Sequence, residues 1–319
     1  MSGEVVGTEP WMPARLRAVP WLVEPVPAAR LAALRIAVGL TLLGDVLVTY
    51  VPHMRDLYGR GSLGGRAIFP EWSPPARATW SLFAGVASPG AFQAIAWIWA
   101  LAALLLALGV ASRVSAAVAW AIAVSLLHLN PAAHYAGDMV CIILLSILML
   151  SPCGAAWSVD ALVKKRGPGV RVPPWPLRLV MLQMALIYFG NGLHKITFEH
   201  GRAGDWLRGE AVYAVIANLN WARFPYPSQP MPFFATELLT WVVFAFELGF
   251  PIWMLVRWTR TPALLVGASF HLGLLVFMQL GFFPPFMLCL YVPLVPWERV
   301  ETFFRSRVIR AAPRGHQEG

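Results

Sequence analysis

The stretch RLAALRIAVGLTLLGDVLVTYV, residues 30–51, is long and apolar enough to cross a bilayer as a single helix. Similar apolar segments recur along the chain, at 80–110, 114–129, 136–151, 176–194, 237–257, 261–280 and 283–296, the first of them as one long or broken segment. We therefore predict an all-α fold, a polytopic integral membrane helix bundle with about eight transmembrane helices.

The composition supports this class. Of 319 residues, 58% are hydrophobic and 13% are charged, whereas a soluble domain is roughly 45–50% apolar and about 25% charged. The net charge of +9 comes from scattered Arg residues in short loops and a tail. Because a nucleic-acid domain gathers its charge on one basic face, we predict no nucleic-acid partner.

The distribution of Lys and Arg predicts the orientation. With the N-terminus inside, fifteen of these residues fall in the inner segments and eight in the outer ones. Positively charged loops stay on the cytoplasmic side of the membrane. We expect the cell membrane as the location, with both termini cytoplasmic.

Two outer segments, 52–79 and 195–236, are too long to be simple connectors and too aromatic to be disordered. We predict that both fold onto the outer face. The chain divides into an N-terminal cytoplasmic segment (1–29), a transmembrane domain (30–297) and a basic cytoplasmic tail (298–319).

Lys195 lies at the end of an apolar helix, in IYFGNGLHKITFEHGRAGDWLRGEAV, residues 187–212. Close to hydrocarbon the ammonium loses hydration, and the neutral amine becomes accessible as a general base. Alternatively, Lys195 extends to lipid headgroups, as lysines at helix ends commonly do. A base role requires that carboxylates do not clamp the ammonium, and Asp205 and Glu199 are the nearest along the chain.

His271 and Glu247 lie inside apolar helices, where an ionisable residue indicates function and should face the bundle interior. The alternative for His271 is a structural histidine that hydrogen-bonds a helix carbonyl. A charged Glu247 needs a partner, for which we expect Arg35 or a histidine. His134 and Asp138 occupy a short outer turn, where polar residues are also common without function.

No phosphate-binding loop, dinucleotide motif or zinc-ligand spacing is present in the sequence. The seven histidines are not spaced as metal ligands. We predict no metal site.

Several motifs occur in an order that resembles the horizontally transferred transmembrane domain family, which includes the membrane part of vitamin K-dependent γ-carboxylase. They are RLAALRIAVGL, DLYGRGSL, LGVASR, Asn130 with GD at 137–138, IYFGNGLHK with WLRGEAV, FELGFP, and FHLGLLVFMQLGFFP. The resemblance covers about residues 28–297.

The resemblance implies catalytic roles for three residues. Lys195, in YFGNGLHK, matches the lysine that deprotonates the vitamin K hydroquinone. His271 matches a histidine of the site region, and His134 is a weaker match to a second one. A reduced quinone of the vitamin K or menaquinone type is the implied cofactor. We expect the substrate to contact Tyr188, Asn191, Trp206 and Glu247.

The leading interpretation is a quinol-dependent, carboxylase-like membrane lyase that uses Lys195 as base, with membrane lipid and quinone as partners. The carboxylase has a large extra-membrane domain that grips a propeptide, and this sequence ends shortly after its last predicted helix, so we do not expect high-affinity recognition of a protein substrate. The alternative is a non-catalytic membrane partner or carrier, for example in the maturation or binding of a secreted peptide or lipid. A secreted peptide is therefore a further candidate partner.

Overall fold

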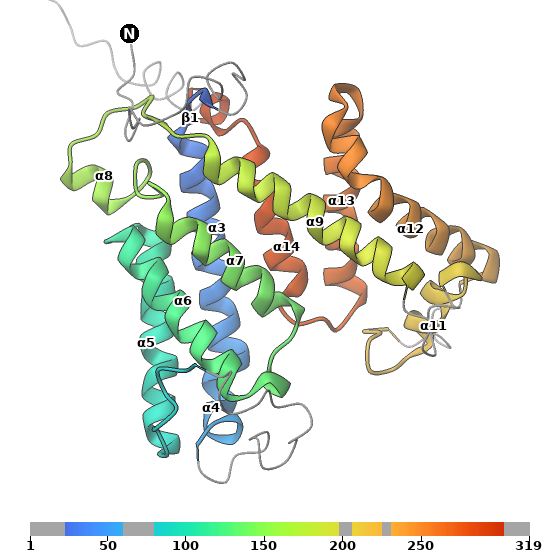
Figure 1. Ribbon diagram of the computed structural model, residues 1–319, viewed down its shortest axis with the longest axis horizontal. Helices are drawn as coiled ribbons and strands as arrows, with labels where there is room; N and C mark the ends of the chain where they lie inside the picture. The colour runs from blue at the N-terminus through green and yellow to red at the C-terminus, as the bar shows by residue number, and fades with distance from the viewer. Residues whose placement is uncertain (1–22, 60–79, 198–205, 225–230, 303–319) are drawn as a thin grey trace, which may run out of the picture. The chain divides into compact units, whose positions relative to one another are not determined.

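The computed structural model describes residues 23–59, 80–197, 206–224 and 231–302 (Figure 1). These residues are mostly helical, and the strands β1 (Val26–Pro27) and β2 (Arg171–Val172) pair antiparallel. The predicted all-α class is confirmed. Residues 60–79, 198–205 and 225–230 of the predicted outer loops, and 1–22 and 303–319 of the predicted terminal segments, lie outside the described residues.

The chain divides into two compact units. The first unit comprises Met1–Pro131, Ile142–Leu177 and Val292–Gly319, and the second comprises Ala132–Cys141 and Arg178–Tyr291. The first contains α3 (Ala28–Asp45), η1 (Val46–Tyr50), α4 (Val51–Leu57), α5 (Pro89–Leu108), α6 (Ser112–Leu129), α8 (Val159–Val163) and η6 (Val292–Leu294). The second contains α11 (Ala211–Ala217), α12 (Phe233–Leu255), α13 (Arg257–Phe277) and α14 (Phe283–Tyr291). Both units include residues of α7 (Ala136–Leu150) and α9 (Trp175–Thr197), and the short η4 (Pro131–Ala133) also spans their boundary.

Five stretches of the described chain are long and apolar enough to cross a membrane. They are Ala28–Leu57, Pro89–Leu108, Ser112–Leu129, Phe233–Leu255 and Trp258–Phe277. The helices α7 and α14 are apolar but shorter, and α9 is long but carries Arg178 and Lys195. The chain is therefore built from apolar helices of a membrane protein, and the count of eight stays a prediction.

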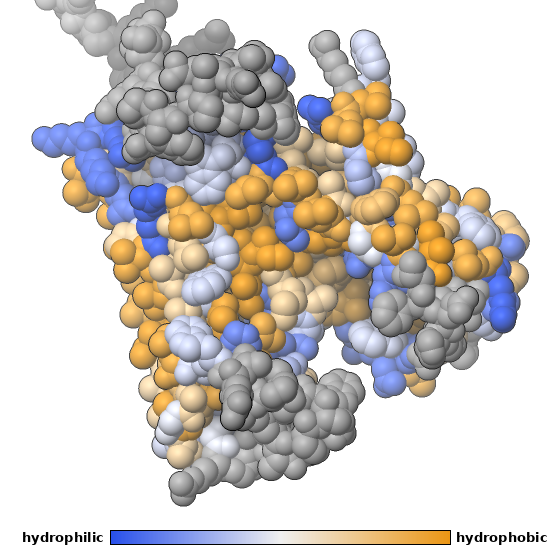
Figure 2. Space-filling model, viewed as in Figure 1, coloured by the Kyte–Doolittle hydropathy of each residue, from blue (hydrophilic) through white to orange (hydrophobic). Residues whose placement is uncertain are grey.

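Helix α5 shows how such a helix divides its faces. Its buried side is made largely of small residues, including Ala96, Ala100, Ala103 and Ala107. Large side chains lie on the other side, where Trp97 is 54% exposed. Small residues let helices approach closely in lipid, and large apolar ones contact the lipid. Figure 2 shows this apolar surface extending along the helices.

The start of α5 differs from the sequence prediction of one long or broken segment over 80–110. The helix begins at Pro89, after a turn and an extended Ser88. Proline is favoured at the first helical position because it has no N–H to satisfy there and its φ is already helical. The prolyl start therefore shortens this span to Pro89–Leu108.

The helices α3 and α5 pack against each other. A Cβ atom added to Gly39 would lie 2.6 Å from the backbone N of Ala107. Only glycine permits this approach of the two backbones.

The first span contains one π turn, η1, between α3 and α4. Such turns widen the helix by one residue and leave carbonyl groups that need other partners. The Nε2 of Gln93 on α5 donates a hydrogen bond of 3.1 Å to the carbonyl of Val51. Gln93 thereby satisfies a carbonyl directly after the π turn.

Arg35 is fully buried in α3 and bonds to the loop after α7. Its guanidinium donates to the carbonyls of Cys153, at 3.3 Å, and Trp157, at 2.5 Å. It also lies against Gly109, which ends α5 with a φ of 74°. Arg35 therefore holds backbone carbonyls and the end of a neighbouring helix.

The start of α6 is held by Asp160 of α8. Its carboxylate accepts hydrogen bonds from the backbone N–H groups of Ala111 and Ser112, both at 2.8 Å, and from the Ser112 hydroxyl at 2.7 Å. Burial alone would raise the pKa of Asp160. The bonds from Ser112 and Ala111 and the nearby Lys164 charge outweigh burial and hold this pKa below its ordinary value of 3.8.

Replacing Asp160 by Asn should lower the free energy of unfolding by ~1 kcal/mol, because both carboxylate oxygens accept hydrogen bonds and the amide nitrogen of Asn cannot. A lowered pKa stabilises the folded state above the unfolded pKa, and this stability is lost as pH falls through the folded pKa. Wild type should therefore lose stability below about pH 4, and the variant should lack this part of the acid dependence. Thermal unfolding in detergent at pH 7 and pH 3 measures both. Equal acid sensitivity of the two proteins would contradict the assignment.

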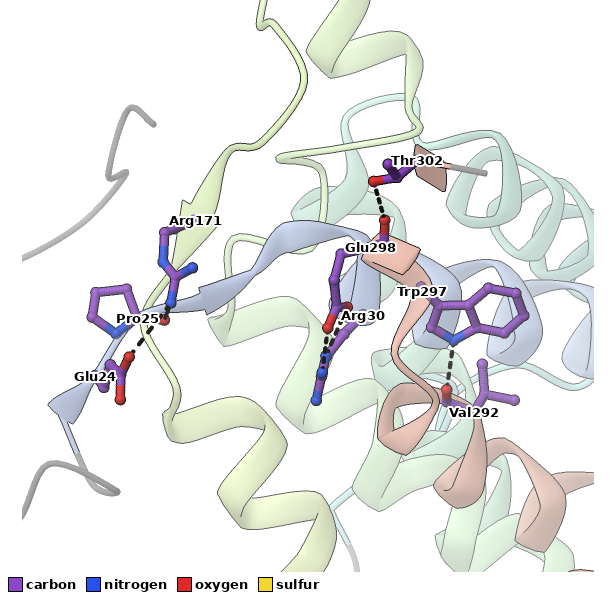
Figure 3. A network of polar contacts seen from close by, with 8 residues as sticks. All are labelled: Glu24, Pro25, Arg30, Arg171, Val292, Trp297, Glu298 and Thr302. Atoms are coloured by element: carbon purple, nitrogen blue, oxygen red, sulfur yellow. Dashed lines mark hydrogen bonds and ion pairs between the residues drawn. The ribbon is translucent and has the colours of Figure 1, made fainter. Parts of the chain in front are cut away.

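Polar contacts also join distant segments of the first unit (Figure 3). Arg30 of α3 donates to both carboxylate oxygens of Glu298, at 3.1 and 2.5 Å. This bonding is the main reason that the pKa of Glu298 lies below its ordinary value, against the opposing effect of burial. The guanidinium of Arg171 donates to the carbonyl of Pro25, beside the β1 and β2 pair.

In the second unit, α12 packs against α11 and α13, and α13 packs against α14. Gly192 of α9 lies against α12, since an added Cβ would come within 2.9 Å of Cδ2 and 3.0 Å of the backbone N of Leu248. An added Cβ at Gly190, on the same helix, meets no atom within 4 Å.

We expect Gly192→Ala to lower the apparent melting temperature and Gly190→Ala to raise or preserve it. Alanine favours a helix over glycine by up to ~1 kcal/mol, and only at Gly192 does the new methyl group collide with backbone. Parallel thermal unfolding of the two variants in detergent measures the difference. The same shift for both would show that α9 does not approach α12 closely.

Candidate functional site

Three predicted site residues lie along one stripe of α9. Tyr188, Asn191 and Lys195 are three and four residues apart, which places them on the same face of a helix. All three border a cavity of about 820 Å³ within the second unit. The stripe therefore supplies one wall of this cavity.

Most of the remaining wall is apolar. Val212, Val215 and Ile216 follow helical spacing on α11 and form one side. Further apolar residues come from α12, α13 and α14. A largely apolar cavity with a few polar groups is typical of a small-molecule site. The polar side chains bordering it are Tyr188, Asn191, Lys195, Trp206, Glu247 and His271.

Lys195 faces into the unit. Its Nζ forms an ion pair with Oε2 of Glu247 and lies 3.7 Å from the centroid of the Trp206 ring. The two paired side chains are 13% and 7% exposed. This arrangement favours a cavity residue over the alternative of a lysine extended to headgroups.

The partner of Glu247 differs from the sequence prediction. We expected Arg35 or a histidine, but Glu247 pairs with Lys195, and Arg35 bonds backbone carbonyls instead. We also expected that carboxylates would not clamp Lys195, and the structure places one carboxylate, that of Glu247, against it. The physical reason is that a buried charge without a counter-charge is costlier than a buried pair, so the two opposite charges on facing helices pair with each other. Asp205 and Glu199 lie outside the described residues.

His271 is buried, with an exposure of 2%. Its Nε2 lies 2.8 Å from the hydroxyl of Tyr188, which also hydrogen-bonds the hydroxyl of Tyr291. The expected interior position of His271 and Glu247 is thus observed. Neither alternative for His271 foresaw a tyrosine as its partner.

The sequence analysis did not identify Tyr291 or Gly267, the glycine that lies against its hydroxyl. A Cβ added to Gly267 of α13 would lie 2.1 Å from the Tyr291 hydroxyl. Gly267 precedes His271 by four residues, one helical turn. A glycine one turn from a buried histidine was the available signal, since it leaves room for another side chain.

A family model for the HTTM domain matches residues 23–296. The chain belongs to the HTTM domain family. This domain is shared with the membrane region of vitamin K-dependent γ-carboxylase, so the resemblance inferred from the motifs is confirmed. No curated protein and no solved structure matches the chain.

His134 contacts Asp138 at the start of α7. Its Nδ1 lies 3.1 Å from Oδ2 of Asp138, which also accepts a hydrogen bond from the backbone N–H of Tyr135. His134 is not among the residues that border the cavity. Its catalytic role stays a prediction, and its observed contacts fit a structural turn at the start of α7.

Within the described part of the HTTM domain, no group of three or more His, Cys, Asp or Glu side chains could hold a metal ion. The polar groups that border the cavity are the Lys195 and Glu247 ion pair, the Asn191 amide, the Trp206 indole, and the His271 imidazole with its Tyr188 partner. Such a set can bind oxygen atoms on an apolar ligand and exchange protons with them.

Proposed function

We propose that this chain is a membrane enzyme that takes a reduced quinone from the bilayer and uses Lys195 to remove a proton from its hydroxyl group. One observation carries the proposal: Lys195 borders a cavity of about 820 Å³ with mainly apolar walls. Membership of the HTTM domain family supports it, because the carboxylase shares this domain.

The residues of the cavity fit a planar ring with oxygen atoms. The apolar faces of α11, α12 and α13 suit the ring and its tail, and water is largely excluded. Trp206, beside Lys195, offers an aromatic face for stacking. Asn191 lies between Tyr188 and Lys195 on the stripe and can orient a ligand oxygen.

Glu247 can accept the proton that the Lys195 ammonium must lose before the amine acts as a base. Holding an ammonium and a carboxylate out of water is costly, so a buried pair is only partly compensated by its attraction. When the proton passes from Lys195 to Glu247, both side chains become neutral. The amine is then free to accept a proton from the substrate, and Glu247 serves as a proton acceptor for Lys195.

Blocking the cavity tests this proposal. Val243→Trp places an indole in the cavity, whereas Val242→Trp adds the same group at a neighbouring position that is 48% exposed and does not border it. In lipid nanodiscs, wild type and Val242→Trp should consume a reduced naphthoquinone, and Val243→Trp should not. Circular dichroism confirms that both variants fold. Equal consumption by both would contradict the proposed site.

The second candidate is a non-catalytic carrier or partner that binds an apolar ligand or a secreted peptide. The Lys195 and Glu247 ion pair favours it, since a lysine held as an ammonium binds rather than reacts. Under this function the purified protein binds a naphthoquinone but does not consume it. A tightly associated peptide without quinone would support the peptide role.

For the location, we propose the cell membrane with both termini cytoplasmic. The support is the excess of Lys and Arg in the inner segments, fifteen against eight.

A further inference from the structure

Three buried side chains from three helices form a hydrogen-bonded chain in the second unit. Tyr291 of α14 bonds Tyr188 of α9, and Tyr188 bonds Nε2 of His271 of α13, at 2.8 Å. Their exposures are 8%, 2% and 2%. His271 and Tyr188 also border the cavity.

The number of hydroxyl hydrogens sets the direction of these hydrogen bonds. Each tyrosine hydroxyl has one hydrogen to donate. If Tyr291 donates to Tyr188 and Tyr188 donates to Nε2, both hydroxyl hydrogens are used. In the reverse direction Tyr291 needs another acceptor, and within the described ranges its hydroxyl has none besides Tyr188. In the described part of the protein, the reverse direction leaves two buried groups unpaired, the Tyr291 hydrogen and the Nδ1 lone pair, whereas the first direction leaves only the Nδ1 hydrogen unpaired. Each unpaired buried group is unfavourable, so the first direction is preferred.

In that direction Nε2 is an acceptor, and the hydrogen of the neutral imidazole is on Nδ1. Among the residues that the structure describes, the buried Nδ1 has no hydrogen-bond partner. The ring borders the cavity, next to Phe283, whose ring centroid lies 5.8 Å away. Because Phe283 also borders the cavity, we infer that a movement of its side chain opens the buried Nδ1 to a ligand oxygen.

We propose that the two tyrosines fix His271 as a hydrogen-bond donor to the ligand, so that the cavity takes a ligand with an acceptor oxygen at this point. Tyr188 and Lys195 are seven residues apart, two turns or ~10.5 Å along α9. The ligand therefore carries oxygen atoms on two opposite sides of an apolar ring. This inference rests on the proposed function and deepens it, because it assigns the residue that binds the second ligand oxygen in the same cavity.

The tautomer of His271 is the first measurement. Protein labelled with ¹⁵N-histidine in lipid bilayers is examined by solid-state NMR without ligand, and His271→Gln identifies the signal. We expect that Nδ1 carries the proton and that Nε2 is unprotonated. The opposite tautomer, or protonation of both nitrogens, would overturn the inference.

Two glycine variants test the source of the tautomer. Gly267→Ala collides with the Tyr291 hydroxyl, whereas Gly190→Ala meets no atom. Tyr188→Phe removes the donor to Nε2 directly. We expect mixed tautomers in Tyr188→Phe, a perturbed His271 signal in Gly267→Ala and an unchanged signal in Gly190→Ala. A single unchanged tautomer in Tyr188→Phe would show that the tyrosines do not set it.

The ligand class is tested with 2-methyl-1,4-naphthoquinone and 2-methylnaphthalene, which share a ring system and differ in the two oxygens. Only the quinone should shift the Nδ1 signal. An Asn side chain places its amide near the Nδ1 position and a Gln near Nε2. Quinone binding should therefore weaken about tenfold in His271→Gln, as for one lost hydrogen bond, and less in His271→Asn.

Equal shifts with both probes, or equal binding by both variants, would refute the donor role. These measurements involve no turnover. A protein with the expected tautomer and quinone binding but without quinol consumption would therefore refute the enzyme proposal and leave this inference standing.

Discussion

Lys195→Arg is expected to reduce consumption of a reduced quinone by ~10²–10⁴-fold, the usual contribution of a general base. Arginine keeps the positive charge and its pairing with Glu247, but guanidinium stays protonated and cannot accept a proton. Binding of the oxidised quinone should change much less than turnover. Turnover in nanodiscs and equilibrium binding by the same preparation measure the two effects separately.

Lys164→Arg is the matched control, because it makes the same substitution at a residue of the first unit outside the cavity. It should leave turnover unchanged. Full turnover by Lys195→Arg would exclude the base role. Loss of quinone binding together with turnover would instead indicate that the larger guanidinium blocks the cavity.

Glu247→Gln is expected to destabilise the folded protein by ~3–5 kcal/mol, because it leaves the Lys195 charge buried without its counter-charge. Replacing both residues by apolar ones of similar size, Lys195→Met with Glu247→Leu, should recover most of this loss. The double variant removes both charges, and with them the cost of keeping them out of water. Thermal unfolding in detergent of Lys195→Met, Glu247→Leu and the double variant gives the coupling between the two side chains.

Glu237→Gln, on the same helix α12, is the control for this series. It does not border the cavity and should change stability little. A double variant as unstable as Glu247→Gln would show that packing, and not the charge pair, accounts for the loss. Unchanged stability of Glu247→Gln would show that the ion pair does not stabilise the fold.

Most of the helices could be predicted from sequence because apolar length is a local property. The segments 114–129 and 136–151 match α6 and α7 within two residues at each end. The start of α5 was missed because the apolar character of residues 80–88 outweighed the signal of Pro89. Similarly, α12 begins four residues before the predicted 237, since aromatic residues extend the apolar stretch.

Parts of the site could be predicted where one helix carries them. Lys195 was predicted from its place at the end of an apolar helix and from the family motif, and Tyr188 and Asn191 from the family resemblance, and all three lie on one face of α9. The Lys195 partner and Tyr291 could not, because they come from helices 52 and 103 residues away from their contacts. A sequence indicates that a buried charge needs a partner, but it does not indicate which one when several are available.

The π turn also sets the phase of the first span. An α-helix advances ~100° per residue, and η1 accommodates about one extra residue in its turn. Residues of α4 are therefore rotated by ~100° from where an uninterrupted α3 would place them. Met54, which is fully buried, faces the interior in this rotated phase. The buried positions before and after the turn thus face the same interior, although they are out of step in the sequence and a single 3.6-residue period cannot describe both.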